Sequence, residues 1–223
     1  MAAKKYYAVK KGRETGIFKD WEQCRASVEG YADAEFKGFL RLEDAKGYLG
    51  EFPGETVENT RETADPKDRP KEGTLLAYVD GSYDHTLKRY AFGCVFILPD
   101  GRIKIRHGNG NNPKSLQQRN VTGEMLGAMY AVRTAMISGF SKIEIRYDYE
   151  GIEKWVTGAW RSKTELTQKY AAAMQQWGKT ISICFTKVAA HSNVYYNEMA
   201  DQTAKAGLRE GDGVPGVCHI EEL

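Results

Sequence analysis

The stretch LLAYVDGSYD, residues 75–84, constrains the fold more than any other part of the sequence. Its apolar first half, followed by turn-forming residues, predicts a buried strand that ends near Asp80. A carboxylate in that position is costly unless it is paired or bound to a cation, which favours a functional interpretation of Asp80. Asp and Gly also favour turns, so Asp80-Gly81-Ser82 by itself leaves an ordinary turn open.

Outward from this strand, the apolar pattern predicts an alternation of strands and helices up to residue 208. Further strands are expected at residues 90–98, 102–110, 142–148 and 180–188, and helices at 120–139, 151–160, 164–178 and 195–207. The turn Pro99-Asp100-Gly101 separates the first two of these strands. This order predicts an α/β domain in which an antiparallel meander is continued by crossover strands into a mixed sheet with helices on its faces.

Three further acidic residues lie where this pattern would place metal ligands. Glu124 is near the start of a predicted helix, Asp148 ends a strand, and Asp201 lies in the last helix. Mg²⁺ and Mn²⁺ prefer hard oxygen ligands, and two such ions about 4 Å apart can activate water and stabilise the leaving oxygen of a phosphodiester. Each acid also has an ordinary explanation, because helix first turns and solvated helix faces favour acids. The residue pattern alone does not show that the four acids converge.

Composition divides the chain into four parts. Residues 1–50 form a compact unit rich in aromatic residues, with short strands, two short helices and Asp20 as the expected N-cap of the first helix. Residues 51–72 contain three prolines and many charges, which predicts a flexible linker. Residues 73–208 form the large α/β unit, and the turn-rich residues 209–223 are expected to be a loose tail.

Bulk composition bears on the class of protein. The 223 residues are 41% apolar and 28% charged, as in globular proteins, and no run of about 18 apolar residues could span a membrane. The N-terminal residues lack the apolar segment of a secretory signal, and the four cysteines are far apart. We therefore expect a cytoplasmic, reduced protein with no membrane partner. The net charge of +2 does not by itself indicate a nucleic-acid partner.

In order along the chain, the sequence supplies Asp80-Gly81-Ser82, Glu124, Asp148, His191, Asn197-Glu198 and Asp201. In this set and order it resembles the catalytic domain of type 1 ribonuclease H, over essentially all of residues 73–208. The resemblance implies a ribonuclease H-like mixed five-stranded sheet flanked by helices. It also implies an endoribonuclease that hydrolyses the RNA strand of RNA/DNA hybrids with two Mg²⁺ ions, for which Mn²⁺ can substitute, and leaves 5′-phosphate and 3′-hydroxyl ends.

The same resemblance assigns a role to each residue. Asp80 and Asp148 would bind the ions, with Asp80 bridging both, and Glu124 and Asp201 would complete one site each. His191 would lie on a mobile loop and assist product release or proton handling, whereas a lone His before a Ser-Asn turn is more often a surface residue. Clustered carboxylates also favour a cation on physical grounds, because they raise one another's pKa values.

The resemblance further implies contacts with the nucleic acid. Backbone groups and one Asn side chain would read 2′-hydroxyls of the RNA strand. Arg119 stands where the family usually has Thr, and its guanidinium can bind a DNA phosphate through two hydrogen bonds. The pair Tyr149-Glu150 departs from the commoner Ser-Gln at a position of RNA contact. The expected contact residues of this unit are Gly81, Ser82, Arg119, Asn120, Thr164 and Asn197.

The first unit carries a second resemblance. Its segments YYAVKKGRETGIF and FKGF resemble the hybrid-binding domain found ahead of many ribonucleases H and in a caulimovirus inclusion protein. Tyr7, Trp21, Phe36 and Lys37 fall on the positions that this small α/β module uses for nucleic acid. Aromatic faces stack there, and Lys neutralises phosphate. Without the motif, Trp21 and Phe36 would be core residues of a small domain. The implied partner is an RNA/DNA hybrid, with weaker binding to double-stranded RNA, and we expect a monomer.

Two other functions stay open on the sequence. A degenerate ribonuclease H fold could bind hybrids or double-stranded RNA without cleaving them, although the complete set of four acids argues against this. The second alternative is a ribonuclease H module cut from a retroelement polyprotein. The linker and the N-terminal unit favour a free-standing cellular enzyme instead.

Overall fold

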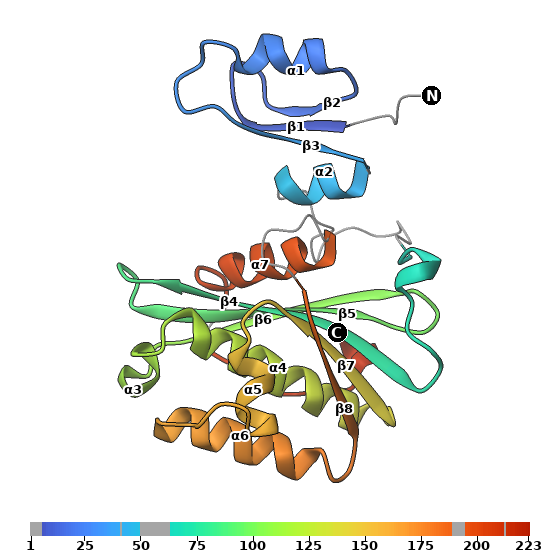
Figure 1. Cartoon of the computed structure of the whole chain (residues 1–223), viewed down its shortest axis with the longest axis vertical. Coiled ribbons are helices and arrows are strands. Elements are labelled where there is room, and N and C mark those ends of the chain that lie inside the picture. The colour runs from blue at the N-terminus through green and yellow to red at the C-terminus, as the bar shows by residue number, and fades with distance from the viewer. Residues whose placement is uncertain (1–5, 41, 50–62, 189–194, 212) are drawn as a thin grey trace. The chain divides into compact units, whose positions relative to one another are not determined.

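The structure is a computed structural model of the chain, and it describes residues 6–40, 42–49, 63–188, 195–211 and 213–223. Contacts divide the chain into two compact units, which are described separately (Figure 1). The smaller unit contains a three-stranded sheet and the larger one a five-stranded sheet. None of the described helices is long and apolar enough to cross a membrane.

The five strands of the larger unit lie in the order β6-β5-β4-β7-β8. Their bounds are β4 Thr74–Asp84, β5 Arg89–Ile97, β6 Ile103–Gly110, β7 Lys142–Tyr147 and β8 Ser182–Lys187. β4, β5 and β6 pair antiparallel, whereas β7 pairs parallel with β4 and β8 parallel with β7. Tight turns can join antiparallel neighbours, but parallel neighbours require longer crossovers. The predicted mixed five-stranded sheet is therefore confirmed.

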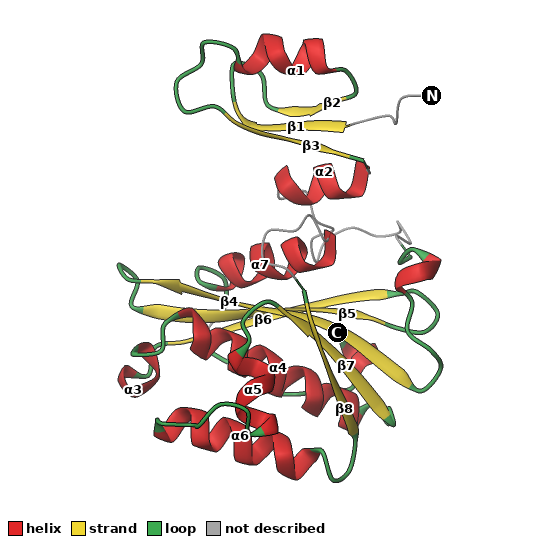
Figure 2. Ribbon diagram, viewed as in Figure 1, coloured by secondary structure: helices red, strands yellow, loops and turns green. Residues whose placement is uncertain are grey.

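Helices cover both faces of this sheet (Figure 2). One face carries α4 Asn120–Ile137, α5 Gly151–Thr157 and α6 Glu165–Trp177, after the short α3 Pro113–Leu116, and the other face carries α7 Tyr195–Gly207. The main core lies between the sheet and α4, where Val79 and Phe92 from the strands join Met125 and Ala128 from the helix. Alternate residues of each strand reach this core because successive side chains point to opposite faces.

Residues 63–72 differ from the expectation of a flexible linker. Ala64 is buried, and its N–H donates to the Gly101 carbonyl at 2.7 Å. The Arg69 guanidinium donates to the Ala64 carbonyl, across the 3₁₀ turn η1 Pro66–Asp68. Composition misled the prediction because a few backbone hydrogen bonds and one small buried side chain suffice to dock a polar segment. The other residues of that predicted linker, 51–62, lie outside the described part of the chain.

The C-terminal residues also differ from the expected loose tail. Ile220 is buried against the main core, with Val217 and Leu223 packed beside it. Ile220 begins the 3₁₀ turn η2 Ile220–Glu222, and its N–H donates to Ser138 Oγ at 2.8 Å. These three apolar residues recur at every third position, the period of a 3₁₀ helix, but the segment is too short and too rich in turn formers for that pattern to have been recognised.

The smaller unit has the strand order β2-β1-β3, all antiparallel. Its elements are β1 Tyr6–Lys11, β2 Gly16–Phe18, α1 Trp21–Val28, β3 Glu35–Phe39 and α2 Leu42–Leu49. Asp20 is the N-cap of α1, as expected, and accepts a hydrogen bond from the Glu22 N–H. Two small apolar clusters lie on opposite faces of the sheet, one around Val9 and the other around Ala8. Alternation along β1 therefore assigns one helix to each face.

Candidate active site

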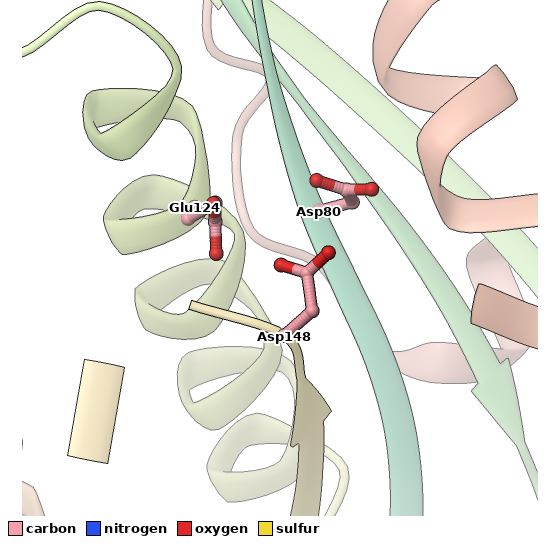
Figure 3. A group of neighbouring side chains, drawn as sticks. All are labelled: Asp80, Glu124 and Asp148. Atoms are coloured by element: carbon pink, nitrogen blue, oxygen red, sulfur yellow. The ribbon is translucent and has the colours of Figure 1, made fainter. Parts of the chain in front are cut away.

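Three carboxylates meet in the larger unit. Asp80, Glu124 and Asp148 each offer one oxygen, and these three atoms all lie within 4.8 Å of one another. Figure 3 shows that they come from β4, α4 and the end of β7 and that their carboxylates converge. A separation of this size suits oxygen ligands that share one cation. The structure thus brings together three of the four acids that the sequence singled out.

Glycines bring α4 close enough to the sheet to place Glu124 beside Asp80. A Cβ atom on Gly81 would lie 2.2 Å from the Asn120 carbonyl oxygen, and one on Gly123 would lie 2.0 Å from the Ala91 carbonyl oxygen. Neither distance is possible for a real Cβ atom, so both positions require glycine at this helix–strand crossing. Asp80 is fixed locally as well, because its Oδ1 accepts a hydrogen bond from the Gly81 N–H at 2.6 Å.

Burial and mutual repulsion disfavour the ionised forms of these acids. Burial raises the pKa of Asp80 to about 8, with help from the charges of Asp148 and Asp201. Burial likewise raises the pKa of Glu124 to about 9, and the charges of Asp80 and Asp148 add to the effect. Glu124 Oε2 is buried and has no hydrogen-bond partner among the described residues. A divalent cation would satisfy that oxygen and offset the repulsion, so these residues fit a metal site.

Asp201 lies apart from the three converging oxygens. It sits on α7, and its Oδ2 accepts a hydrogen bond from Lys205 Nζ at 2.7 Å, one helical turn further on. Its charge nevertheless acts on Asp80, as the raised pKa of Asp80 shows. His191, the fifth predicted catalytic residue, lies outside the described residues.

The structure places the predicted nucleic-acid contacts on several elements. Gly81 and Ser82 continue β4 beyond Asp80 and pair with β5. Arg119 is the N-cap of α4 and has φ +52°, a strained backbone conformation for a residue with a side chain; Asn120 begins the helix. Asn197 is buried in the first turn of α7.

A cleft of about 470 Å³ contains residues that the sequence reasoning did not assign to the site. Trp155 and Trp160 form an edge-to-face pair with ring centroids 6.3 Å apart, and Lys154 Nζ lies 4.9 Å from the centre of the Trp160 ring. Basic residues among aromatic ones in GIEKWVTGAWRSK, residues 151–163, were the available signal. The cleft is lined by Gln118, Tyr149, Trp155, Ala159, Trp160, Arg161, Lys163, Thr164 and Thr167.

Thr164 and Glu150 are both engaged in local structure. Thr164 forms a capping box with Thr167 at the start of α6. Glu150 accepts hydrogen bonds from Lys154 and Lys187, which lower its pKa to about 2. In the structure, the second residue of the pair Tyr149-Glu150 is therefore an ionised carboxylate that is paired with two lysines.

In the smaller unit, three of the four predicted binding residues form an exposed aromatic cluster. Trp21 lies 5.3 Å from Tyr7 and 5.8 Å from Phe36 between ring centroids, and it is 42% exposed. Lys37 is not part of this group. It pairs across the sheet with Ala8, so its side chain leaves from the opposite face. We call Tyr7, Trp21 and Phe36 the aromatic cluster below.

Comparison with known proteins covers both units. A family model described as RNase H matches residues 72–209, and one described as Ribonuclease H1 N-terminal domain matches residues 5–49. Ribonuclease H1 of Rattus norvegicus is 24% identical over 93% of this chain and 90% of its own length. Ribonuclease H of Saccharomyces cerevisiae is 50% identical over 21% of this chain and 13% of its own length. The crystal structure of RNase H1 from Halobacterium salinarum NRC-1 superimposes with a TM-score of 0.52 at 24% identity, over 62% of this chain and 99% of that one.

Proposed function

The chain belongs to the RNase H family, and we propose that it is an endonuclease that hydrolyses the RNA strand of RNA/DNA hybrids with two Mg²⁺ ions. Mn²⁺ would substitute, and the products would carry 5′-phosphate and 3′-hydroxyl ends. The observation that carries this proposal is the convergence of Asp80, Glu124 and Asp148, whose oxygens lie within 4.8 Å of one another. Acids crowded and buried in this way require a cation to stay ionised near neutral pH.

The four acids divide the work of holding the metal. Asp80 would contribute to both ions, Asp148 and Glu124 would lie on one side of it, and Asp201 would approach from α7 on the other. When bound, the ions supply Lewis-acid activation of water and stabilisation of the leaving oxygen. The Gly81 N–H holds the Asp80 carboxylate in one orientation. Burial strengthens each charge interaction, because the surrounding protein screens less than water does.

The surroundings of the site suit a hybrid duplex. Gly81 and Ser82 follow Asp80 on β4, and Asn120 lies one helical turn before Glu124 on α4. Backbone groups of the first two and the side chain of Asn120 would read the RNA strand through its 2′-hydroxyls. The cleft of Trp155 and Trp160, with Arg161 and Lys163 in its lining, would take the DNA strand by stacking and phosphate contact. Arg119, Thr164, Asn197 and His191 keep their predicted roles as contacts and as an aid to turnover.

The smaller unit would bind the same duplex through the aromatic cluster, while Lys37 would contact phosphate from the other face of the sheet. Tethering raises the effective concentration of the catalytic unit on a hybrid that the first unit has bound. We expect weaker binding to double-stranded RNA and a monomeric protein. Support for this division comes from the match of residues 5–49 to the N-terminal domain of Ribonuclease H1.

The decisive experiment is a cleavage assay with end-labelled RNA presented alone, as RNA/RNA and as RNA/DNA, with Mg²⁺ and with EDTA. Wild type is compared with Asp80→Asn, which removes the central carboxylate charge. Asp84→Asn is the matched control, because Asp84 ends the same strand and its carboxylate instead caps the turn at Thr86 and Leu87. We expect metal-dependent cleavage of the hybrid only, retained in the control and reduced by about 10³-fold or more in Asp80→Asn.

Two outcomes would contradict the proposal. Hybrid binding without cleavage, in Mg²⁺ and in Mn²⁺, would favour a non-catalytic reader of hybrids or double-stranded RNA. Normal cleavage by Asp80→Asn would leave the activity in place but move the metal site elsewhere.

A further inference from the structure

Helix α7 carries the fourth acid, Asp201, and lies on the face of the sheet opposite α4. It crosses β5 at Gly93. A Cβ atom on Gly93 would lie 2.3 Å from the Ala200 carbonyl oxygen and 2.6 Å from the Ala204 nitrogen. Both are backbone atoms, which cannot rotate away as a side chain could. The helix backbone therefore rests directly on the strand at this point.

Gly93 is also the strand partner of Asp80. The register of β4 and β5 places Asp80 opposite Gly93, and the register of β5 and β6 places Gly93 opposite His107. The three residues form one row across three strands, with side chains on the same face. Ala200, which contacts Gly93, immediately precedes Asp201. The contact between α7 and the sheet is therefore next to Asp201 on the helix and directly across from Asp80 on the strand.

The far end of α7 is held on the same row. A Cβ atom on Gly207 would lie 3.1 Å from Cβ of His107, the outermost residue of the row. The side chain of Asn109 in β6 donates to the Gly207 carbonyl at 2.8 Å. The helix thus crosses the sheet with two close contacts, one over Gly93 and one over His107. Its height above Asp80 is set by the contact that is nearer to Asp80.

We propose that Gly93 is a positioning residue for the second metal half-site: its missing side chain sets the separation between Asp201 and Asp80. The inference rests on the proposed two-metal function and extends it to a residue that touches neither metal nor substrate. Any side chain at this position lifts α7 and carries Asp201 away from the shared site, whereas Asp80, Glu124 and Asp148 stay in place because α4 contacts the sheet through Gly81 and Gly123 instead.

The test compares Gly93→Ala with Gly127→Ala in calorimetric titration of Mg²⁺ into the protein without hybrid, and in hybrid cleavage over a range of Mg²⁺ concentrations. In the titration, Gly93→Ala should bind Mg²⁺ more weakly than wild type, and Gly127→Ala should bind it equally well. Gly127 is the matched control, because a Cβ atom there would meet Phe92 and Val79 at an ordinary 3.4 Å. We expect Gly93→Ala to raise the Mg²⁺ concentration for half-maximal rate and to lower kcat by up to about 10²-fold, a loss that a displacement of about 1 Å can cause. The KM for the hybrid should not change, since Gly93 lies in no contact surface. Gly127→Ala should match wild type.

An Asp201→Asn background separates positioning from general damage to the fold. If Gly93 acts through Asp201, adding Gly93→Ala to Asp201→Asn should reduce the remaining activity little further. An equal loss in both backgrounds, or an unchanged Mg²⁺ dependence in Gly93→Ala, would overturn the inference while leaving the proposed function intact. A wild-type protein that does not cleave the hybrid would overturn both.

Gly207→Ala keeps the inference testable if Gly93→Ala does not fold. Its Cβ atom would lie 3.1 Å from Cβ of His107, a smaller overlap than those at Gly93. We expect the same rise in the Mg²⁺ requirement, several-fold rather than larger, again with KM unchanged. A Gly207→Ala variant that folds and shows a wild-type Mg²⁺ dependence would count against the proposal that the close contacts between α7 and the sheet position Asp201.

Discussion

The carboxylate site of the larger unit and the aromatic cluster of the smaller unit are built on opposite principles. Asp80 and Glu124 are largely removed from water, and their raised pKa values show that the protein alone disfavours their charges. Trp21 and Phe36 are about two-fifths exposed, and their uncharged rings need no ion to balance them. The first arrangement is costly until a cation arrives, whereas the second offers a surface at little cost. This difference separates a site built for chemistry from a surface built for binding.

The largest effect expected from breaking this comparison is on affinity, through Trp21. Trp21→Ala removes the central ring of the aromatic cluster, and hybrid affinity should fall about tenfold, since a base-stacking ring contributes roughly 1–3 kcal/mol. The turnover of enzyme saturated with hybrid should stay near wild type, because the carboxylate site is untouched. Binding is measured by titration in EDTA and turnover by cleavage at saturating hybrid.

Tyr31→Ala is the matched control for this prediction. Tyr31 is an exposed aromatic residue of the same unit, 39% accessible, but it is not part of the cluster. Its removal should leave affinity unchanged. A loss of saturated turnover in Trp21→Ala, with affinity intact, would show that the two regions do not divide the work as proposed.

The sequence predicted the carboxylate site better than its surroundings. Asp80, Glu124 and Asp148 each had an ordinary explanation taken singly, and it was the resemblance to type 1 ribonuclease H that picked them out as a set. The strand expected to end near Asp80 in fact continues to Asp84. Strand order then brings Asp80 and Asp148 together, since β4 and β7 are parallel neighbours and Tyr78 pairs with Arg146, two residues before each acid. The convergence itself needed the glycine contacts at Gly81 and Gly123, whose role depends on which atoms face them.

What sequence reasoning missed depends on packing between segments far apart in the chain. Lys37 was assigned to nucleic acid through the resemblance to the hybrid-binding domain. Because adjacent side chains of a strand point to opposite faces, its side chain leaves the sheet on the face opposite the aromatic cluster. The docking of Ala64 and Ile220 involves single apolar residues within polar segments, which leave no periodic signal. The cleft at Trp155 and Trp160 needed the loop after α5 to fold back on that helix.

The next effect is on stability without metal. Asp80 and Glu124 hold their protons to about pH 8 and about pH 9 in the folded protein, whereas unfolded carboxyls release theirs near pH 4. The folded state therefore binds more protons in that window, and stability falls as pH rises through it. In EDTA, Glu124→Gln should melt close to wild type at about pH 5 and several degrees higher at about pH 9.

Adding Mg²⁺ should change how the stability of the wild-type protein depends on pH. A cation that binds the ionised acids competes with protons, so the gain in wild-type Tm on adding Mg²⁺ should grow with pH. Asp84→Asn is again the control, because hydrogen bonds from the Leu87 and Thr86 N–H groups lower the pKa of Asp84. In EDTA at about pH 9, the Tm of Asp84→Asn should not exceed that of wild type. Equal melting of wild type and Glu124→Gln at every pH would mean that burial does not strain the site.

The smallest effect concerns Arg119, whose φ of +52° is strained for any residue with a side chain. If this residue is kept for phosphate contact rather than for stability, Arg119→Gly should stabilise the larger unit by about 1 kcal/mol, or roughly 2–4 °C in Tm, and weaken hybrid binding several-fold. Lys88→Gly is the matched control: Lys88 has φ +46° in the turn between β4 and β5. It should gain similar stability with unchanged affinity. If Arg119→Gly bound the hybrid as tightly as Lys88→Gly, the strain beside the carboxylates would have no link to binding, and Arg119 would have to be removed from the interface.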